Sequence, residues 1–138
     1  ITRRRDLLLT LENIAQHMKK KSLFIFDFWN ESAVDGYYSP RKTNLFKVDG
    51  KVLERNSTTR VYPSKHLCEV NYTCSLKQNG RLLERDQERH ILRYFAIDEM
   101  RDCLRTAGLK TIDAHPFLNA GGKIRKNTWD VTMVAQKL

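Results

Sequence analysis

The chain has 138 residues, of which 41% are hydrophobic and 30% are charged, and these values fit one globular domain with a modest core rather than a disordered chain. Its longest unbroken apolar runs, such as residues 23–26, are far shorter than the ~20 residues that span a bilayer, and no secretory signal with an apolar centre is present. The formal net charge of +9 favours anionic partners, but basic and acidic residues are interspersed along most of the chain, which is typical of solvated surfaces.

The first element that the sequence predicts is an amphipathic helix over residues 3–19. Apolar side chains recur there at three- and four-residue intervals and form one stripe that faces a core, and Thr2 is the expected N-cap. The members of the stripe are Leu7, Leu8, Leu11, Ile14, Ala15 and Met18. Three lysines at 19–21 suit the negative end of the helix dipole and predict that the helix ends there.

The segment 22–29, Ser-Leu-Phe-Ile-Phe-Asp-Phe-Trp, is predicted to be a strand that is buried on both faces. Strands of this kind occur mainly in parallel sheets covered by helices on both sides, so the expected fold class is α/β. Such an apolar strand would be an aggregation site at an open sheet edge. We therefore expect the final strand of the chain to pair with it on one side. On the other side we expect a strand from another segment or from a second copy of the chain.

A polar and aromatic loop is predicted over residues 30–42, beyond the carboxyl end of that strand, where open α/β sheets bind their ligands. Two hairpin signals follow, Asp49-Gly50 and Asn79-Gly80, and they predict four antiparallel strands. We therefore expect a single domain over residues 1–138 with an antiparallel β insertion at 40–95.

The last part of the chain predicts one helix and two strands. An apolar stripe with helical spacing covers residues 97–107, and Gly108 follows at the position where a glycine commonly ends a helix. Closing strands are expected at 109–117 and 128–137, joined by a loop that contains Gly121-Gly122.

Four segments of the chain resemble class I S-adenosylmethionine-dependent methyltransferases, most closely the small-molecule branch that includes amino-sugar N-methyltransferases. These segments are Leu11–Met18, Leu23–Trp29, Glu88–Phe95 and Glu99–Leu109. In that family a helix leads into the fifth strand of a seven-stranded sheet, an antiparallel insertion follows, and the last strand inserts between the fifth and sixth strands. The resemblance implies that the chain is the C-terminal, acceptor-side half of this Rossmann-like sheet.

The motifs that hold the cofactor in this family have no counterpart in the chain. The family uses a glycine-rich loop after its first strand and an acidic residue after its second, both in the other half of the fold. Gly121-Gly122 does not replace them, because it joins two predicted strands and no helix begins after it. The first residue is Ile1 rather than methionine, so we expect a piece of a longer protein. Binding of S-adenosylmethionine is expected only together with a cofactor half from an upstream segment or another chain.

Glu88 and His90 are the predicted catalytic pair. The two-residue period of the last hairpin strand places both on one face and Arg93 on the other. A carboxylate can orient an imidazole and raise its basicity, and the three residues resemble a Glu-x-His-x-x-Arg pattern of the family. The resemblance implies that this strand folds over the carboxyl end of the fifth strand, so that His90 takes a proton from the acceptor and Arg93 serves acceptor binding or packing. The alternative is a half-exposed histidine beside a structural ion pair.

Four further residues are predicted to bind the acceptor. Asp27 interrupts an apolar strand near its carboxyl end, where a buried carboxylate needs a partner, so it either contacts the acceptor or caps a nearby amide. Trp29, Tyr37 and Tyr38 could form the wall of a pocket for a cationic amine or sulfonium, since aromatic faces attract cations. The alternative for these aromatic residues is that they cover the core.

Three function classes stay open. The first is the acceptor-binding half of a methyltransferase for a small amine or hydroxyl compound, and the second is a non-catalytic module of the same fold that serves binding or assembly. The third is a basic nucleic-acid-binding protein that contacts phosphates through Arg85, Arg89 and Arg93.

The cysteines and histidines predict neither a disulfide nor a metal site. Cys68 and Cys74 lie on one predicted strand about 20 Å apart at ~3.3 Å per residue, too far to bridge. With Cys103 they form an odd set without a CxxC motif, which favours reduced thiols and a cytoplasmic protein. His66 and Cys68 share a strand face, but two ligands without a third are weak evidence for a metal.

Overall fold

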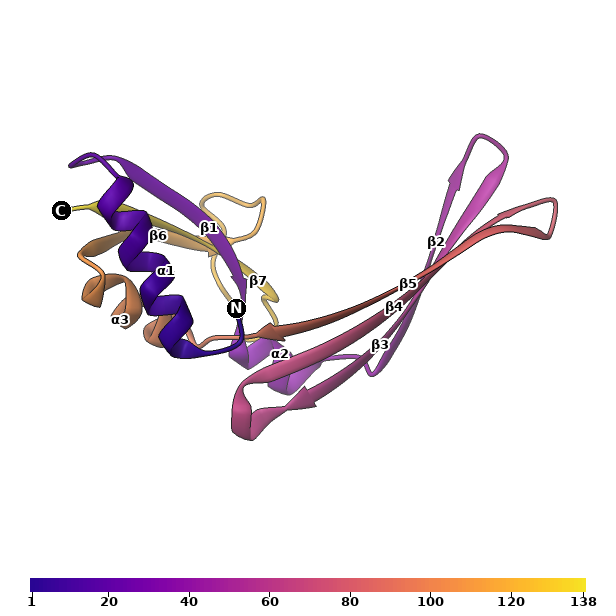
Figure 1. The fold of residues 1–138 in the computed structure, drawn as a ribbon, viewed down its shortest axis with the longest axis horizontal. Coiled ribbons are helices and arrows are strands. Elements are labelled where there is room, and N and C mark those ends of the chain that lie inside the picture. Colours follow the sequence, from indigo (N-terminus) through magenta and orange to yellow (C-terminus); the bar gives the residue numbers. More distant parts are fainter. The chain divides into compact units, whose positions relative to one another are not determined.

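The computed structural model describes residues 1–138, which form two compact units (Figure 1). Unit 1 comprises residues 1–37 and 93–138, and unit 2 comprises residues 38–92. The elements in chain order are α1 (Arg4–His17), β1 (Leu23–Trp29), α2 (Glu31–Tyr37), β2 (Arg41–Val48), β3 (Lys51–Tyr62), a short 3-10 helix (Pro63–Lys65), β4 (Leu67–Gln78), β5 (Arg81–Arg93), α3 (Ile97–Thr106), β6 (Leu109–Pro116) and β7 (Asp130–Lys137). None of the helices is long and apolar enough to cross a bilayer.

Unit 1 is built on a three-stranded sheet with the order β1-β7-β6. The last strand pairs antiparallel with both neighbours, and it lies between them. This order confirms the expectation that the final strand inserts beside the strand at 22–29. Helices α1 and α3 cover one face of the sheet (Figure 1). The core between them contains Leu7, Leu11, Ala15, Phe28, Phe95, Met100, Cys103, Leu104, Ala107, Leu109, Val131, Met133 and Ala135.

The prediction that β1 is buried on both faces is wrong for this chain. Phe24, Phe26 and Phe28 face the core, whereas Leu23 and Ile25 on the opposite face are 53% and 62% exposed. The chain supplies helices for one face of the sheet only, and β1 is an edge strand whose only strand partner is β7. At the carboxyl end of β1 the Phe95 amide donates to the Trp29 carbonyl at 3.0 Å. A second strand beside β1 stays a prediction.

The predicted loop at 30–42 is also wrong, because helix α2 occupies most of it. The backbone amides of Ala33 and Val34 donate to the carbonyl of Asn30 and begin the helix. The Asn30 side chain donates to the Ser32 hydroxyl at 3.0 Å and to the Thr128 carbonyl at 3.1 Å. This turn is therefore held by a contact to a residue 98 positions away, which the local composition of residues 30–42 does not reveal.

The start of α1 differs from the expectation by one residue. Arg3 rather than Thr2 is the N-cap, and it makes no side-chain cap hydrogen bond. Its guanidinium instead donates to the carboxylate of Asp6 at 2.8 Å. An acidic side chain in the first turn suits the positive end of the helix dipole, so this pair takes the place of the predicted cap.

Both hairpin predictions are confirmed. Asp49 and Gly50 have φ angles of 50° and 70°, and Asn79 and Gly80 have 49° and 76°. Two successive left-handed residues make the type I′ turn, whose twist matches that of antiparallel strands. The turns organise unit 2 as a four-stranded sheet with the order β2-β3-β4-β5 (Figure 1).

Ion pairs between strands stabilise one face of the unit 2 sheet. Lys77 contacts Glu54 at 2.6 Å, and Arg89 contacts both carboxylate oxygens of Glu69 at 3.1 Å. Hydrogen bonds from Arg89 and Asn71 lower the pKa of Glu69 to about 2. On β5, Arg89 lies on this face, whereas Glu88 and His90 contact each other on the opposite face, as the two-residue period of a strand requires.

Candidate functional site

Glu88 and His90 form a hydrogen-bonded pair on β5. The imidazole Nε2 lies 2.9 Å from the Glu88 carboxylate, and the side chains of His90 and Glu88 are 45% and 60% exposed. The alternation of strand side chains explains why residues two positions apart meet on one face. The pair has the geometry in which a carboxylate orients an imidazole, and it is open to solvent and to ligands.

A row of side chains across all four strands of unit 2 leads to His90. The His90 ring lies edge-to-face with Tyr72 on β4, with centroids 5.6 Å apart and an interplanar angle of 69°. The Arg55 guanidinium on β3 lies 5.5 Å from the Tyr72 ring centroid and 5.8 Å from that of Phe46 on β2. The sequence pattern gives no sign of Tyr72 and Arg55, because their proximity to His90 depends on strand register.

Asp27 and Trp29 lie at the carboxyl end of β1, beside the start of β7. Asp27 pairs in register with Thr132, and Trp29 with Asp130. The Asp27 residue is exposed, so the expectation of a buried carboxylate is wrong. The Trp29 and Trp129 rings pack in a T-shape with centroids 5.3 Å apart. Two carboxylates and two indole rings therefore gather at this end of the sheet.

Among these four residues, Asp130 has a raised pKa. Burial raises its pKa, the negative charge of Asp27 raises it further, and a hydrogen bond from Trp29 opposes both effects. Sequence alternation gave no sign of Asp130, because its proximity to Asp27 follows from the pairing of β1 with β7.

Asp27→Asn is expected to lower the pKa of Asp130 without returning it to the ordinary value, since burial remains. A raised folded-state pKa means that ionisation opposes folding. The stability contributed by protonated Asp130 is therefore complete below the unfolded-state pKa and is lost as the pH rises through the folded-state pKa. Carboxyl-carbon NMR titration measures the shift, with Asp113→Asn on β6 as the control. An unchanged Asp130 titration in Asp27→Asn would contradict the coupling.

The other predicted site residues are Tyr37, Tyr38 and Arg93. Tyr37 belongs to unit 1 and Tyr38 to unit 2, and they are 57% and 40% exposed. Arg93 donates to Glu99 at 3.1 Å and lies over the Phe95 ring, with its side chain only 14% exposed. These are the contacts of a structural ion pair that fixes the end of β5 to α3.

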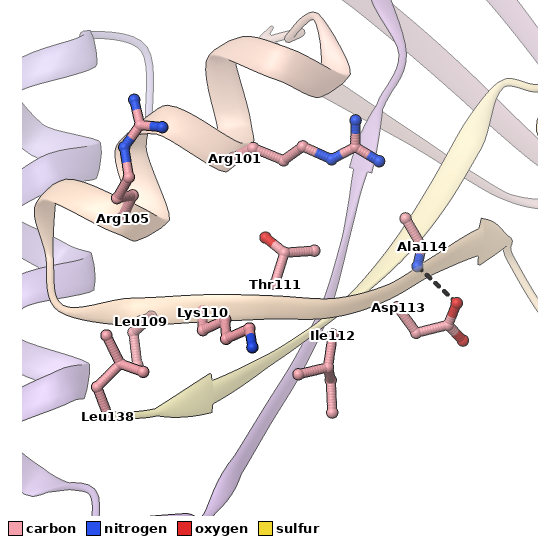
Figure 2. A pocket seen from close by; sticks show the side chains of 9 residues that line it. All are labelled: Arg101, Arg105, Leu109, Lys110, Thr111, Ile112, Asp113, Ala114 and Leu138. Atoms are coloured by element: carbon pink, nitrogen blue, oxygen red, sulfur yellow. Dashed lines mark hydrogen bonds between the residues drawn. The ribbon is translucent and has the colours of Figure 1, made fainter.

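Unit 1 has an open groove of about 660 Å³ between α3 and β6 (Figure 2). Two of its three cationic lining residues, Arg101 and Arg105, already pair with Asp98 and Asp102 at 2.9 Å and 2.8 Å. None of the predicted site residues lines it; its walls are Arg101, Arg105, Leu109, Lys110, Thr111, Ile112, Asp113, Ala114 and Leu138. We assign it no part of the candidate site.

The glycines with left-handed backbone lie in turns and connections between elements. Gly50 and Gly80 lie in hairpin turns, Gly108 follows α3, and Gly121 lies between β6 and β7. None of them connects the end of a strand to the start of a helix. No group of three or more His, Cys, Asp or Glu side chains is arranged to hold a metal ion.

The fold is that of about half of an S-adenosylmethionine-dependent methyltransferase. The structure superposes with a TM-score of 0.81 on an S-adenosylmethionine-dependent methyltransferase from Clostridium acetobutylicum, at 16% identity, over 99% of this chain and 53% of that one. The TM-score with an amino pentose methyltransferase from Micromonospora echinaspora is 0.75, at 10% identity, over 100% of this chain and 53% of that one. The TM-score with the CcbJ methyltransferase from Streptomyces caelestis is 0.72, at 12% identity, over 100% of this chain and 56% of that one. No protein-family model and no curated protein matches the sequence.

These superpositions confirm the expected α/β class and the resemblance to half of a methyltransferase fold. The chain spans about half the length of the solved methyltransferases that it matches, while they cover nearly all of it. At 10–16% identity the likeness concerns the fold.

Proposed function

We propose that the chain is the acceptor-binding, C-terminal half of an S-adenosylmethionine-dependent methyltransferase that acts on a small amine or hydroxyl compound. The observation that carries the proposal is the fold match, which takes in 99–100% of the chain and about half of each methyltransferase. S-adenosylmethionine would have to be held by groups outside these 138 residues.

In this proposal His90 removes a proton from the acceptor, and Glu88 orients the imidazole and stabilises its charged form. The 2.9 Å hydrogen bond and the exposure of both side chains support these roles. Asp27 and Trp29 bind the acceptor, with Asp130 beside them; carboxylates and indole rings together suit a cationic amine. Tyr37 and Tyr38 stay candidates for the wall of that pocket. The contacts of Arg93 with Glu99 favour packing for this residue.

The two edges of the unit 1 sheet suggest where the partner half pairs. The outer strand β6 has a bulge at Thr111/Asp113, and the Asp113 carboxylate accepts a hydrogen bond from the Ala114 amide at 2.8 Å. Bulges and charges protect an edge against strand addition. In contrast, β1 pairs with β7 over seven residues without a bulge and exposes Ile25. We therefore place the partner strand, from another segment or another chain, along β1.

The other two function classes have less support. All three arginines considered as phosphate contacts already bind protein groups: Arg85 donates to the Ser75 hydroxyl at 3.4 Å, Arg89 binds Glu69, and Arg93 binds Glu99. A non-catalytic module of this fold would show neither cofactor binding nor turnover when it is completed. The cysteines are all free, with Cys68 and Cys103 buried, so the proposal places the protein in a reducing compartment such as the cytoplasm.

Calorimetry with S-adenosylmethionine tests the proposal. The isolated 138-residue chain is expected to show no binding in the low micromolar range, which corresponds to about −8 kcal/mol, because no cofactor loop is present. The same chain extended by its upstream coding sequence, or mixed with a separate cofactor half, is expected to bind. Micromolar binding by the isolated chain would contradict the proposal that groups outside these 138 residues hold the cofactor. The absence of binding and turnover in every extended form would favour the non-catalytic module.

A further inference from the structure

We infer that His90 presents Nδ1 as its proton-accepting atom and that Tyr72 is a positioning residue that holds the imidazole in this orientation. The inference rests on the proposed function, in which His90 is the base. It adds the identity of the reacting nitrogen and a residue on a neighbouring strand that sequence analysis did not find.

The contact with Glu88 determines which nitrogen is available. An ionised carboxylate only accepts hydrogen bonds, so the nitrogen beside it must carry a hydrogen. That nitrogen is Nε2, which lies 2.9 Å from the Glu88 Oε2 atom. The neutral imidazole is then the Nε2–H tautomer, and its lone pair is on Nδ1.

One hydrogen bond does not fix the imidazole ring. Glu88 and His90 are both exposed, and each side chain has rotatable bonds, so their contact alone would leave the ring free to turn. The Tyr72 ring packs edge-to-face against the imidazole at 5.6 Å and restricts that rotation. Arg55 lies 5.5 Å from the centroid of the same Tyr72 ring and restricts the tyrosine in turn.

The step that this arrangement supports is a proton transfer from the acceptor to Nδ1 of His90. The N–H or O–H bond of the acceptor breaks, its electron pair stays on the acceptor atom, and the proton forms a bond to Nδ1. The resulting imidazolium carries one positive charge, which the Glu88 carboxylate stabilises through Nε2–H. Tyr72 does not touch the acceptor in this scheme and acts only through His90.

Nitrogen NMR on the 138-residue chain tests the assignment without any turnover. Long-range proton–nitrogen correlation of labelled histidine distinguishes the two neutral tautomers, and His90→Gln identifies the His90 signals among the four histidines. Wild type and Tyr72→Phe, which keeps the ring, are expected to show the Nε2–H tautomer. Tyr72→Leu is expected to show a mixture, and circular dichroism checks that it folds. Glu88→Gln, whose amide can donate or accept, is a second variant that should lose the preference.

Two NMR results would overturn the inference: a dominant Nδ1–H tautomer in wild type, or a folded Tyr72→Leu protein with the wild-type tautomer. Turnover by the completed methyltransferase is a separate measurement. There Tyr72→Leu is expected to lower kcat by roughly tenfold with KM nearly unchanged, since misplacing a reacting group costs up to about 10²-fold. The expected NMR result with unchanged kcat would reject His90 as the base and leave the tautomer assignment standing.

Discussion

Replacing His90 with alanine in the completed methyltransferase is expected to lower turnover by roughly 10²–10⁴-fold, the usual contribution of general acid–base catalysis. The side chain is 45% exposed, so its loss should change the free energy of unfolding little. Glu88→Gln should give a smaller loss of turnover, because the imidazole stays in place but is oriented less well. Steady-state kinetics and urea denaturation of the same preparations separate the two effects.

Glu84→Gln is the matched control for these variants. Glu84 is an exposed carboxylate on β5. It precedes Glu88 by four residues, so it lies on the same face of the strand, and it has no contact with His90. Its replacement should leave turnover unchanged. Wild-type turnover in His90→Ala would remove His90 from the mechanism and make Asp27 the next candidate for the base.

Phe28→Ala in the 138-residue chain is expected to destabilise unit 1 by about 3–5 kcal/mol, the usual cost of removing a buried phenyl ring. Phe28 is 7% exposed, and its ring packs against those of Phe26 and Phe95 at 6.2 Å each. Urea denaturation followed by the fluorescence of Trp29 and Trp129, both in unit 1, measures the effect on this unit.

Ile25→Ala provides the comparison on the opposite face of the same strand. Ile25 is 62% exposed, so its truncation should change the stability of this chain by no more than about 0.5 kcal/mol. In a completed protein, where we expect a partner to cover β1, the same substitution should become destabilising. Equal losses for Phe28→Ala and Ile25→Ala in the isolated chain would contradict the one-sided core.

The elements that the sequence determined by itself are those whose causes are local. Asp49-Gly50 and Asn79-Gly80 accept the left-handed backbone of a type I′ turn, so both hairpins follow from four residues. Gly108, with φ of 75°, likewise ends α3 where the helical spacing stops. The pairing of Glu88 with His90 belongs to this class, since it depends only on the two-residue period of one strand.

Tertiary structure decided the features that depend on partners far along the chain. Helix α2 exists where a loop was expected, because Asn30 bonds to Thr128. Asp130 reaches Asp27 through the register of β1 with β7, and Tyr72 reaches His90 through the packing of β4 beside β5. The apolar run of β1 showed that its faces are suited to burial, but the number of faces covered depends on how many helices and strands surround the sheet. A sequence specifies local backbone preferences residue by residue, whereas register and coverage are set only when distant elements pack together.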